Sequence, residues 1–224
     1  MKKCCYNFYA ILLIASAALN CTQPQRVPAE KAVHKEAYSI DYIKSDTMDQ
    51  KEFWKIIDYS FFESNGNQQQ QENLLIQKLV AYTPEQIIEF EKIFRRYVIE
   101  ADDFKIVGAE KIIEGVVTDD GYLYFRCWLI AQGEHTFKET LKLPDNLAGN
   151  VDKDGYTQFE ELMYVADKAY MQKTGKKQED QTFPRDVAYK SGLDYDFGAP
   201  PTKGNKWTPD QLPGLYPKLW AKFH

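Results

Sequence analysis

The chain has 224 residues, of which 44% are hydrophobic, 14% aromatic and 27% charged. This length suits one domain with a substantial core, and the aromatic content excludes low-complexity disorder over the middle of the chain. A formal net charge of −5 without a basic stripe argues against a nucleic-acid partner.

The first twenty residues have the pattern of a secretory signal peptide. Lys2 and Lys3 give a basic start, and residues 8–19 form an apolar run of twelve residues. Twelve residues are too few to cross a bilayer as a helix but suit the apolar part of a signal. Loss of this segment would take the formal net charge from −5 to −7, because it carries two lysines and no acid.

Cys21 follows at once, and Ala18-Leu19-Asn20-Cys21 resembles the lipobox of bacterial lipoproteins. In such proteins the cysteine becomes the first mature residue and carries acyl chains. The resemblance implies a lipid-anchored protein of the bacterial cell envelope, in either the inner or the outer membrane. Asn20 departs from the usual small residue, and Leu19 lies one place late. A plain signal cleaved nearby and an uncleaved anchor are the alternatives.

Cys127 would be the one cysteine left for the folded domain, because Cys4 and Cys5 leave with the signal and Cys21 is lipidated. A single thiol cannot form an internal disulfide, so the domain must be held together by its core. The apolar surroundings of Cys127 in the sequence predict a buried, inert thiol.

We expect three parts in the chain: a signal peptide over residues 1–20, a flexible tether over 21–46, and a helical domain over 47–224 with a core at 48–175 and a C-terminal extension at 176–224. The tether is rich in Gln, Pro, Ala, Lys and Glu and lacks apolar periodicity. In the domain, apolar residues recur at helical spacing and no strand-like alternation is sustained. The predicted class is mainly α, as a single compact domain of about seven helices.

Capping signals place the first three helices. Asp49 with Glu52 three places on predicts a capping box at the start of the first helix, and residues 65–67 predict its end. Residues 68–71 are interpreted as a polar lead into the second helix. Thr83-Pro84-Glu85-Gln86 predicts a further capping box, with proline in the first turn of the third helix.

The remaining helices are expected over residues 103–116, from about 119 to 133, from about 137 to just before Pro144, and from about 159 to 173. Thr118, Asp119 or Asp120 would cap the central one of these, and Gly133 would close it.

Beyond the seventh helix, residues 176–206 are expected to be irregular, because Gly, Pro and Asp interrupt the periodicity. Residues 208–211 repeat the capping pattern before a short aromatic closing segment. Trp207, Trp220 and Phe223 would be costly to expose, so we expect this segment to pack on the domain.

The chain resembles the DUF4240 family, a domain of unknown function, over about residues 48–175 and more weakly over 207–223. The residues that carry the resemblance are Phe53-Trp54, Ile88-Glu89-Phe90-Glu91, Asp119-Asp120-Gly121 with Phe125-Arg126 and Trp128-Leu129-Ile130-Ala131-Gln132-Gly133, and Tyr164-Val165-Ala166 with Tyr170. Two departures are residues 112–116, where a more Gly- and Ala-rich stretch is expected, and Cys127 within the central motif. The resemblance implies a helical domain and no particular activity.

Asp119, Asp120 and Arg126 are the first candidate binding residues. Arg126 lies two helical turns after Asp119 on the same face, so a carboxylate–guanidinium pair could line a groove. Such a site could bind a polar ligand, or perform acid–base chemistry if burial shifts a carboxylate pKa. The favoured alternative is that the acids stabilise the start of the helix and Arg126 pairs with a neighbour.

Trp128 and Gln132 are further candidate binding residues on the central helix. They share a face with Phe125 and Leu129, so the aromatic side chains are expected in the core. A buried amide needs partners, so Gln132 should bond a helix end or point into a small pocket.

Residues 150–161 resemble a calcium-binding EF-hand loop. The candidate ligands, at the first, third, fifth, seventh and twelfth places, are Asn150, Asp152, Asp154, Tyr156 and Glu161. Against calcium, Asn150 replaces the usual Asp, Thr157 replaces an aliphatic residue, and Pro144 interrupts an entering helix. There is also no second loop, so we favour a polar turn.

The favoured function is a non-enzymatic protein-interaction or ligand-binding module on a lipid anchor, with an unknown protein or small-molecule partner. The alternatives are an enzyme using Asp119 or Asp120 with Arg126, and a calcium-binding module through residues 150–161. No cofactor other than this calcium is expected, because the three histidines are scattered and no phosphate-binding loop, dinucleotide motif or nucleophile elbow occurs.

Overall fold

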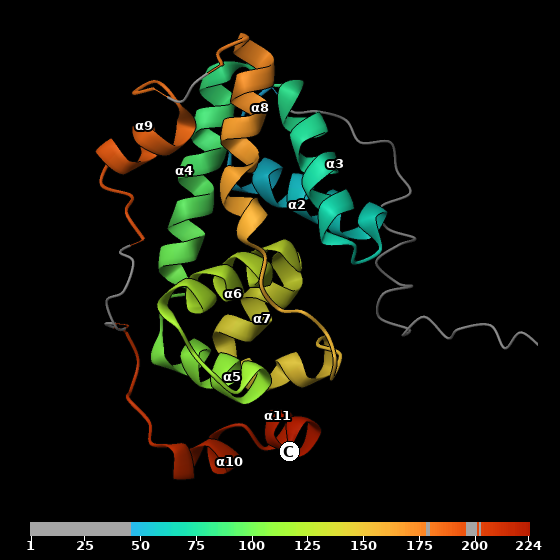
Figure 1. The fold of residues 1–224 in the computed structure, drawn as a ribbon, viewed down its shortest axis with the longest axis vertical. Coiled ribbons are helices and arrows are strands. Elements are labelled where there is room, and N and C mark those ends of the chain that lie inside the picture. The colour runs from blue at the N-terminus through green and yellow to red at the C-terminus, as the bar shows by residue number, and fades with distance from the viewer. Residues whose placement is uncertain (1–45, 178–179, 196–200, 202) are drawn as a thin grey trace, which may run out of the picture.

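The computed structural model describes residues 46–177, 180–195, 201 and 203–224 (Figure 1). The expected signal peptide, Cys21 and all but the last residue of the expected tether lie outside these residues. Within the described residues there is no β-strand, and the one extended contact is an isolated bridge between Asp103 and Lys203. The prediction of a mainly α, compact helical domain is confirmed.

Seven helices correspond one to one with those expected from the sequence: α2 (Gln50–Ser64), α3 (Gln68–Val80), α4 (Pro84–Glu100), α5 (Phe104–Glu114), α6 (Asp119–Ala131), α7 (Glu134–Lys142) and α8 (Val165–Thr174). Two 3-10 turns, η1 (Pro144–Gly149) and η2 (Glu160–Tyr164), lie between α7 and α8. The C-terminal extension adds α9 (Pro184–Lys190), η3 (Pro209–Gln211), α10 (Leu212–Leu215) and α11 (Pro217–Phe223).

The capping box of α4 forms in both directions. The Gln86 backbone N–H donates to the Thr83 hydroxyl at 3.3 Å, and the Thr83 N–H donates to the Gln86 side chain at 3.0 Å. The box predicted for α2 forms only in part, because Asp49 accepts from the Glu52 N–H at 2.8 Å while the Glu52 carboxylate accepts from the Tyr82 hydroxyl instead. Long-range pairing therefore replaces half of this local motif.

Residues 68–71 are the first turn of α3 and not a polar lead, so that expectation was wrong. Asn67 caps the turn by accepting from the Gln70 N–H at 2.9 Å. Gln71 is buried, and its amide donates to the Ala131 carbonyl at the end of α6, at 2.9 Å. A polar residue can be buried here because it satisfies a carbonyl that a helix terminus leaves free.

The extension is more ordered than the sequence indicated, because α9 lies within the segment expected to be irregular. Phe183, directly before α9, is fully buried, and its ring packs 5.2 Å from that of Tyr170. Beyond α9, the guanidinium of buried Arg95 donates to the Leu193 carbonyl at 2.9 Å. These contacts with distant helices stabilise a helix that is too short to show periodicity.

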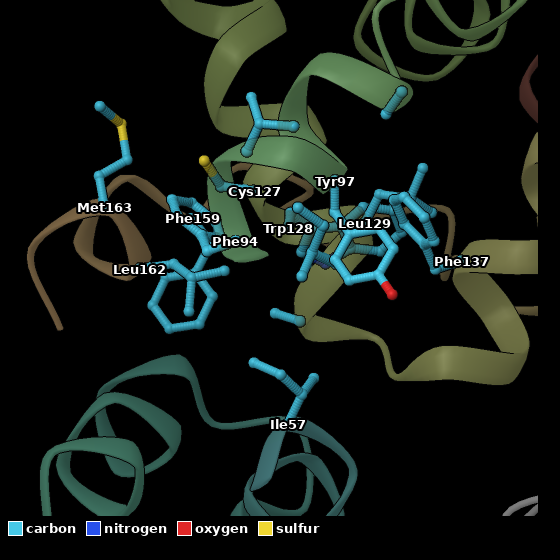
Figure 2. Packing of buried hydrophobic residues seen from close by; sticks show 14 of the residues in the cluster. Ile57, Phe94, Tyr97, Cys127, Trp128, Leu129, Phe137, Phe159, Leu162 and Met163 are labelled. Carbon is cyan, nitrogen blue, oxygen red and sulfur yellow. The ribbon is translucent and has the colours of Figure 1, made fainter. Parts of the chain in front are cut away.

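Helix α6 crosses the middle of the molecule, with α5 on one side and α2, α4 and α8 on the other (Figure 1). All of its residues except Asp119, Asp120 and Tyr124 are buried. Figure 2 shows side chains of several elements around it, grouped as Phe94, Phe159 and Leu162 near Cys127, and Tyr97 and Phe137 near Leu129. A helix that is apolar on nearly all sides belongs inside a core.

Gly133 closes α6, as predicted, and has two reasons to be glycine. Its φ of 92° lies in the region that favours glycine. A Cβ atom at this position would also lie 2.5 Å from the Asp58 carboxylate. Asp58 needs this approach because it accepts from the Glu134 N–H at 2.8 Å and so caps α7.

The closing segment packs on the domain, as expected. Tyr216 donates from its hydroxyl to the Lys105 carbonyl at 2.9 Å, and Trp207 donates from its indole to the Phe104 carbonyl at 2.7 Å. The buried Asp145 of η1 accepts from the backbone N–H groups of Lys218 and Leu219 at the start of α11, at 3.0 and 2.9 Å. No helix in the described part of the chain is both long enough and apolar enough to span a membrane.

Candidate functional site

Asp119 and Asp120 are exposed in the first turn of α6. The cap itself is Thr118, whose hydroxyl accepts from the Gly121 N–H at 3.0 Å. Two carboxylates in the first turn stabilise the positive end of the helix dipole. The capping interpretation therefore accounts for both acids.

Arg126 is buried, and its partner is Asp102 rather than Asp119 or Asp120. Its guanidinium lies 3.4 Å from the Asp102 carboxylate, donates to the Val98 carbonyl at 3.2 Å and stacks 4.4 Å from the centre of the Tyr122 ring. The structure thus does not bring together the acid–arginine pair on which the enzyme hypothesis rested.

Tyr122 and Arg126 together satisfy the C-terminal end of α4. The Tyr122 hydroxyl accepts from the Asp103 N–H at 3.0 Å and lies 3.2 Å from the Ala101 carbonyl. Burial raises the pKa of this hydroxyl well above its usual range, so it stays protonated. The last carbonyls of a helix have no hydrogen-bond donors within that helix. Here two side chains of α6 act as the donors.

Glu110 of α5 is an unusual buried acid that the sequence analysis missed. It is fully buried, and neither carboxyl oxygen has a hydrogen-bond partner within the described residues. One of these oxygens lies 3.6 Å from the position that a Cβ on Gly121 would occupy. Burial, and then the neighbouring Glu114, raise the pKa of Glu110 to about 8, against the opposing charge of Arg126.

A raised carboxyl pKa is often found in catalytic acids. A catalytic acid must lie within hydrogen-bond reach of its substrate. Glu110 differs from such acids because its side chain is fully buried and a substrate has no access to it. We assign Glu110 a structural role, as a carboxyl group that is mostly protonated at neutral pH. The signal in the sequence was its spacing from Ile106 and Ile113, which puts a carboxyl on the apolar side of α5.

Trp128, Gln132 and Cys127 have the surroundings expected of core residues. Trp128 is buried, with its ring 5.5 Å from that of Phe125. Gln132 is half-buried and donates to the Trp128 carbonyl at 3.4 Å, so it bonds the end of its own helix. Burial raises the pKa of the Cys127 thiol far above its usual value, as an inert thiol requires.

Residues 150–161 do not take the arrangement expected of a calcium loop. Among the described residues there is no group of three or more His, Cys, Asp or Glu side chains that could hold a metal ion, and Asp152, Asp154 and Glu161 thus form none. The loop lies between two 3-10 turns, whereas an EF-hand loop lies between two α-helices.

The second half of this loop is attached to α5 and α6. The Thr157 hydroxyl hydrogen-bonds to the Glu114 carboxylate, and the Phe159 N–H donates to the Tyr124 carbonyl at 3.1 Å. These contacts agree with the favoured interpretation of a polar turn that leads into the next helix.

A cleft of about 710 Å³ lies where the C-terminal extension meets the start of α5. Its lining includes Lys105, Lys206, Trp207, Asp210, Leu215 and Tyr216. This volume is in the range of small-molecule sites. Sequence reasoning missed the cleft because its walls come from segments about one hundred residues apart.

Glu110→Gln tests the buried acid by replacing it with a neutral side chain of similar shape. In the wild type, the folded-state pKa of about 8 lies above the ordinary value of 4.5, so the folded chain keeps a proton that the unfolded chain has released. Stability should therefore fall between about pH 4.5 and pH 8 and level off above. We expect the variant to lose this slope and to be more stable at pH 9 by on the order of 5 kcal/mol.

Urea unfolding between pH 5 and pH 9 measures this effect, with exposed Glu63→Gln as the matched control. Glu63→Gln should follow the wild-type curve. Parallel curves for the wild type and Glu110→Gln would contradict the assignment.

Comparison with known proteins supports the family resemblance. Nothing among curated proteins and nothing among solved structures matches the chain. A family described as "Protein of unknown function (DUF4240)" matches residues 48–172, which include α2 and most of α8. Residues 207–223, where the resemblance to this family was weaker, lie outside the match. Because these residues make up more than half of its length, the chain belongs to the DUF4240 family.

Proposed function

We propose that this protein is a non-enzymatic binding module held at a bacterial membrane by a lipid on Cys21. The observation that carries the binding role is the cleft between α5 and the C-terminal extension. Its aromatic and charged lining is typical of sites that bind small molecules.

The polar residues of the central helix argue for binding over catalysis. Arg126 and Tyr122 are occupied with the connection between α4 and α5, and Asp119 and Asp120 are exposed to solvent at the start of α6. None of these four residues lines the cleft. A binding role needs only the cleft, whereas the enzyme hypothesis needs Arg126 to pair with Asp119 or Asp120, and its ion-pair partner is Asp102 instead.

The lipid anchor rests on residues 1–21, which lie outside the described part of the structure. Its support is the basic start, the apolar run and the position of Cys21 directly after them. An acyl anchor followed by a tether would hold the helical domain close to the membrane. The proposed location is the bacterial cell envelope.

Cys21→Ser should release the protein from the membrane. We expect wild-type protein expressed in a bacterial host to take up radiolabelled palmitate and to remain in the membrane fraction after an alkaline wash. The Cys21→Ser variant should lose the label, while Cys5→Ser, altered within the signal, should behave as the wild type. Membrane-bound, unlabelled wild type would indicate an uncleaved anchor, and soluble wild type a plain signal. Either result would overturn the lipid anchor.

Gly214→Leu should fill the cleft and remove binding. Gly214 lines the cleft, and a Cβ at this position meets no atom within 4 Å, so the larger side chain would extend into open space. Gly149→Leu is the matched control, because Gly149 lies outside the cleft and a Cβ there is equally unobstructed.

The measurement is a ligand-observed NMR screen of a mixed fragment library against the full chain in nanodiscs. We expect compounds that bind the wild type and Gly149→Leu but not Gly214→Leu. If no compound distinguishes the two variants, the cleft is not a binding site.

A further inference from the structure

Gly121, in the first turn of α6, lies where three parts of the chain meet. A Cβ atom at this position would lie 2.8 Å from the Thr118 hydroxyl, 3.4 Å from the side-chain nitrogen of Gln158 and 3.6 Å from a carboxyl oxygen of Glu110. The start of α6, the loop that leads to η2 and the helix α5 come together here because glycine leaves the space between them free.

The end of that loop is attached to both helices. We call residues 152–159 the flap. The Thr157 hydroxyl of the flap hydrogen-bonds to the Glu114 carboxylate of α5, and the Phe159 N–H donates to the Tyr124 carbonyl of α6 at 3.1 Å. The first five residues of the flap are exposed, so the contacts at its end hold it against the domain.

Glu110 lies at this junction with nothing to compensate a negative charge. It is fully buried, and within the described residues neither of its carboxyl oxygens has a hydrogen-bond partner. The charged groups that act on it are Glu114, on the same helix, and Arg126 of α6. Arg126 is engaged with Asp102, and the neighbouring Tyr122 hydroxyl stays protonated because burial raises its pKa. A carboxylate here would be buried beside another carboxylate.

An ionised Glu110 needs water, because a charge without partners is costly inside a protein. Water has no easy path through α6, which is buried along nearly all of its length. The flap is the weaker cover. Its charged residues, at positions 152–154, are exposed, and the flap residues at the junction, Thr157 and Gln158, are uncharged. Displacement of the flap therefore admits water at the least cost.

We infer that the flap is a proton-dependent cover, which lies on α5 and α6 while Glu110 is protonated and lifts from them when Glu110 ionises. α6 stays folded in this opening, so the opening is distinct from global unfolding. It is also separate from the cleft, because no flap residue lines the cleft. The pKa of Glu110, raised to about 8 by burial, places the response around neutral and mildly alkaline pH.

The Phe159 amide reports on the flap, because its bond to α6 breaks when the flap lifts. With a pKa of 4.5 in the open state and about 8 in the closed state, Glu110 favours opening about a hundredfold more at pH 9 than at pH 6. Protection of this amide from exchange should fall by that factor. The Gly175 amide, bonded to the Met171 carbonyl at the far end of α8, should keep its protection.

Quench-flow hydrogen–deuterium exchange of the full chain, corrected for the intrinsic rate at each pH, makes the measurement. Glu110→Gln should remove the fall in protection of the Phe159 amide. Glu161→Gln, which changes an exposed acid just beyond the flap, is the matched control and should keep it. Thr157→Val should lower the protection at both pH values and keep the ratio, because it removes an attachment of the flap but not the acid.

Three results would overturn the inference. If the Phe159 amide keeps its protection at pH 9 while the slowest amides of α6 lose theirs, Glu110 ionises only on global unfolding. A fall that persists in Glu110→Gln would assign the response to another group. Unchanged protection in Thr157→Val would show that the flap is not the element that opens.

Discussion

The structure depends on the burial of α6. A helix enclosed on nearly all sides must satisfy its polar side chains inside the protein, because water cannot reach them. Arg126 and Tyr122 meet this requirement by binding Asp102 and the last backbone groups of α4. The pair thereby attaches α6 to the connection between α4 and α5. The residues that most resembled a reactive set in the sequence thus stabilise a helix junction.

Other parts of the molecule attach to the same helix. Gln71 of α3 donates to its last carbonyl, at Ala131, and Gly133 lets Asp58 of α2 cap the helix that follows. The Phe159 N–H donates to the Tyr124 carbonyl, so the segment that leads into α8 runs along α6 as well. A single buried helix therefore determines where its neighbours lie.

Local signals predicted the helices well, because caps and periodicity depend on residues close together in the chain. Thr83 and Gln86 form their box as expected, and seven helices match the seven predicted. The failures all involve partners far apart in sequence. Glu52 turns to Tyr82, and Gln71 becomes buried because the end of α6 needs a donor. α9 forms through contacts that its own sequence does not reveal.

The candidate site was less predictable for the same reason. Arg126 of α6 and Asp102, in the connection between α4 and α5, are 24 positions apart, while the exposed acids nearer to Arg126 were the obvious partners. The cleft joins Lys105 of α5 to Trp207 of the extension, and no spacing rule relates them. Its extension wall, formed by residues 204–216, also lies outside the family match, which ends at residue 172. The proposed binding site thus combines the family domain with a segment beyond it.

The most direct test of this account is hydrogen–deuterium exchange of the full chain, followed by mass spectrometry. If α6 is the element on which its neighbours depend, the amides of residues 125–131 should be among the slowest to exchange and should open only with global unfolding. Amides of α9 and α10 should exchange sooner. Exchange in α6 as fast as in α9 would show that the central helix opens on its own, and would contradict the structural role given to Arg126 and Tyr122.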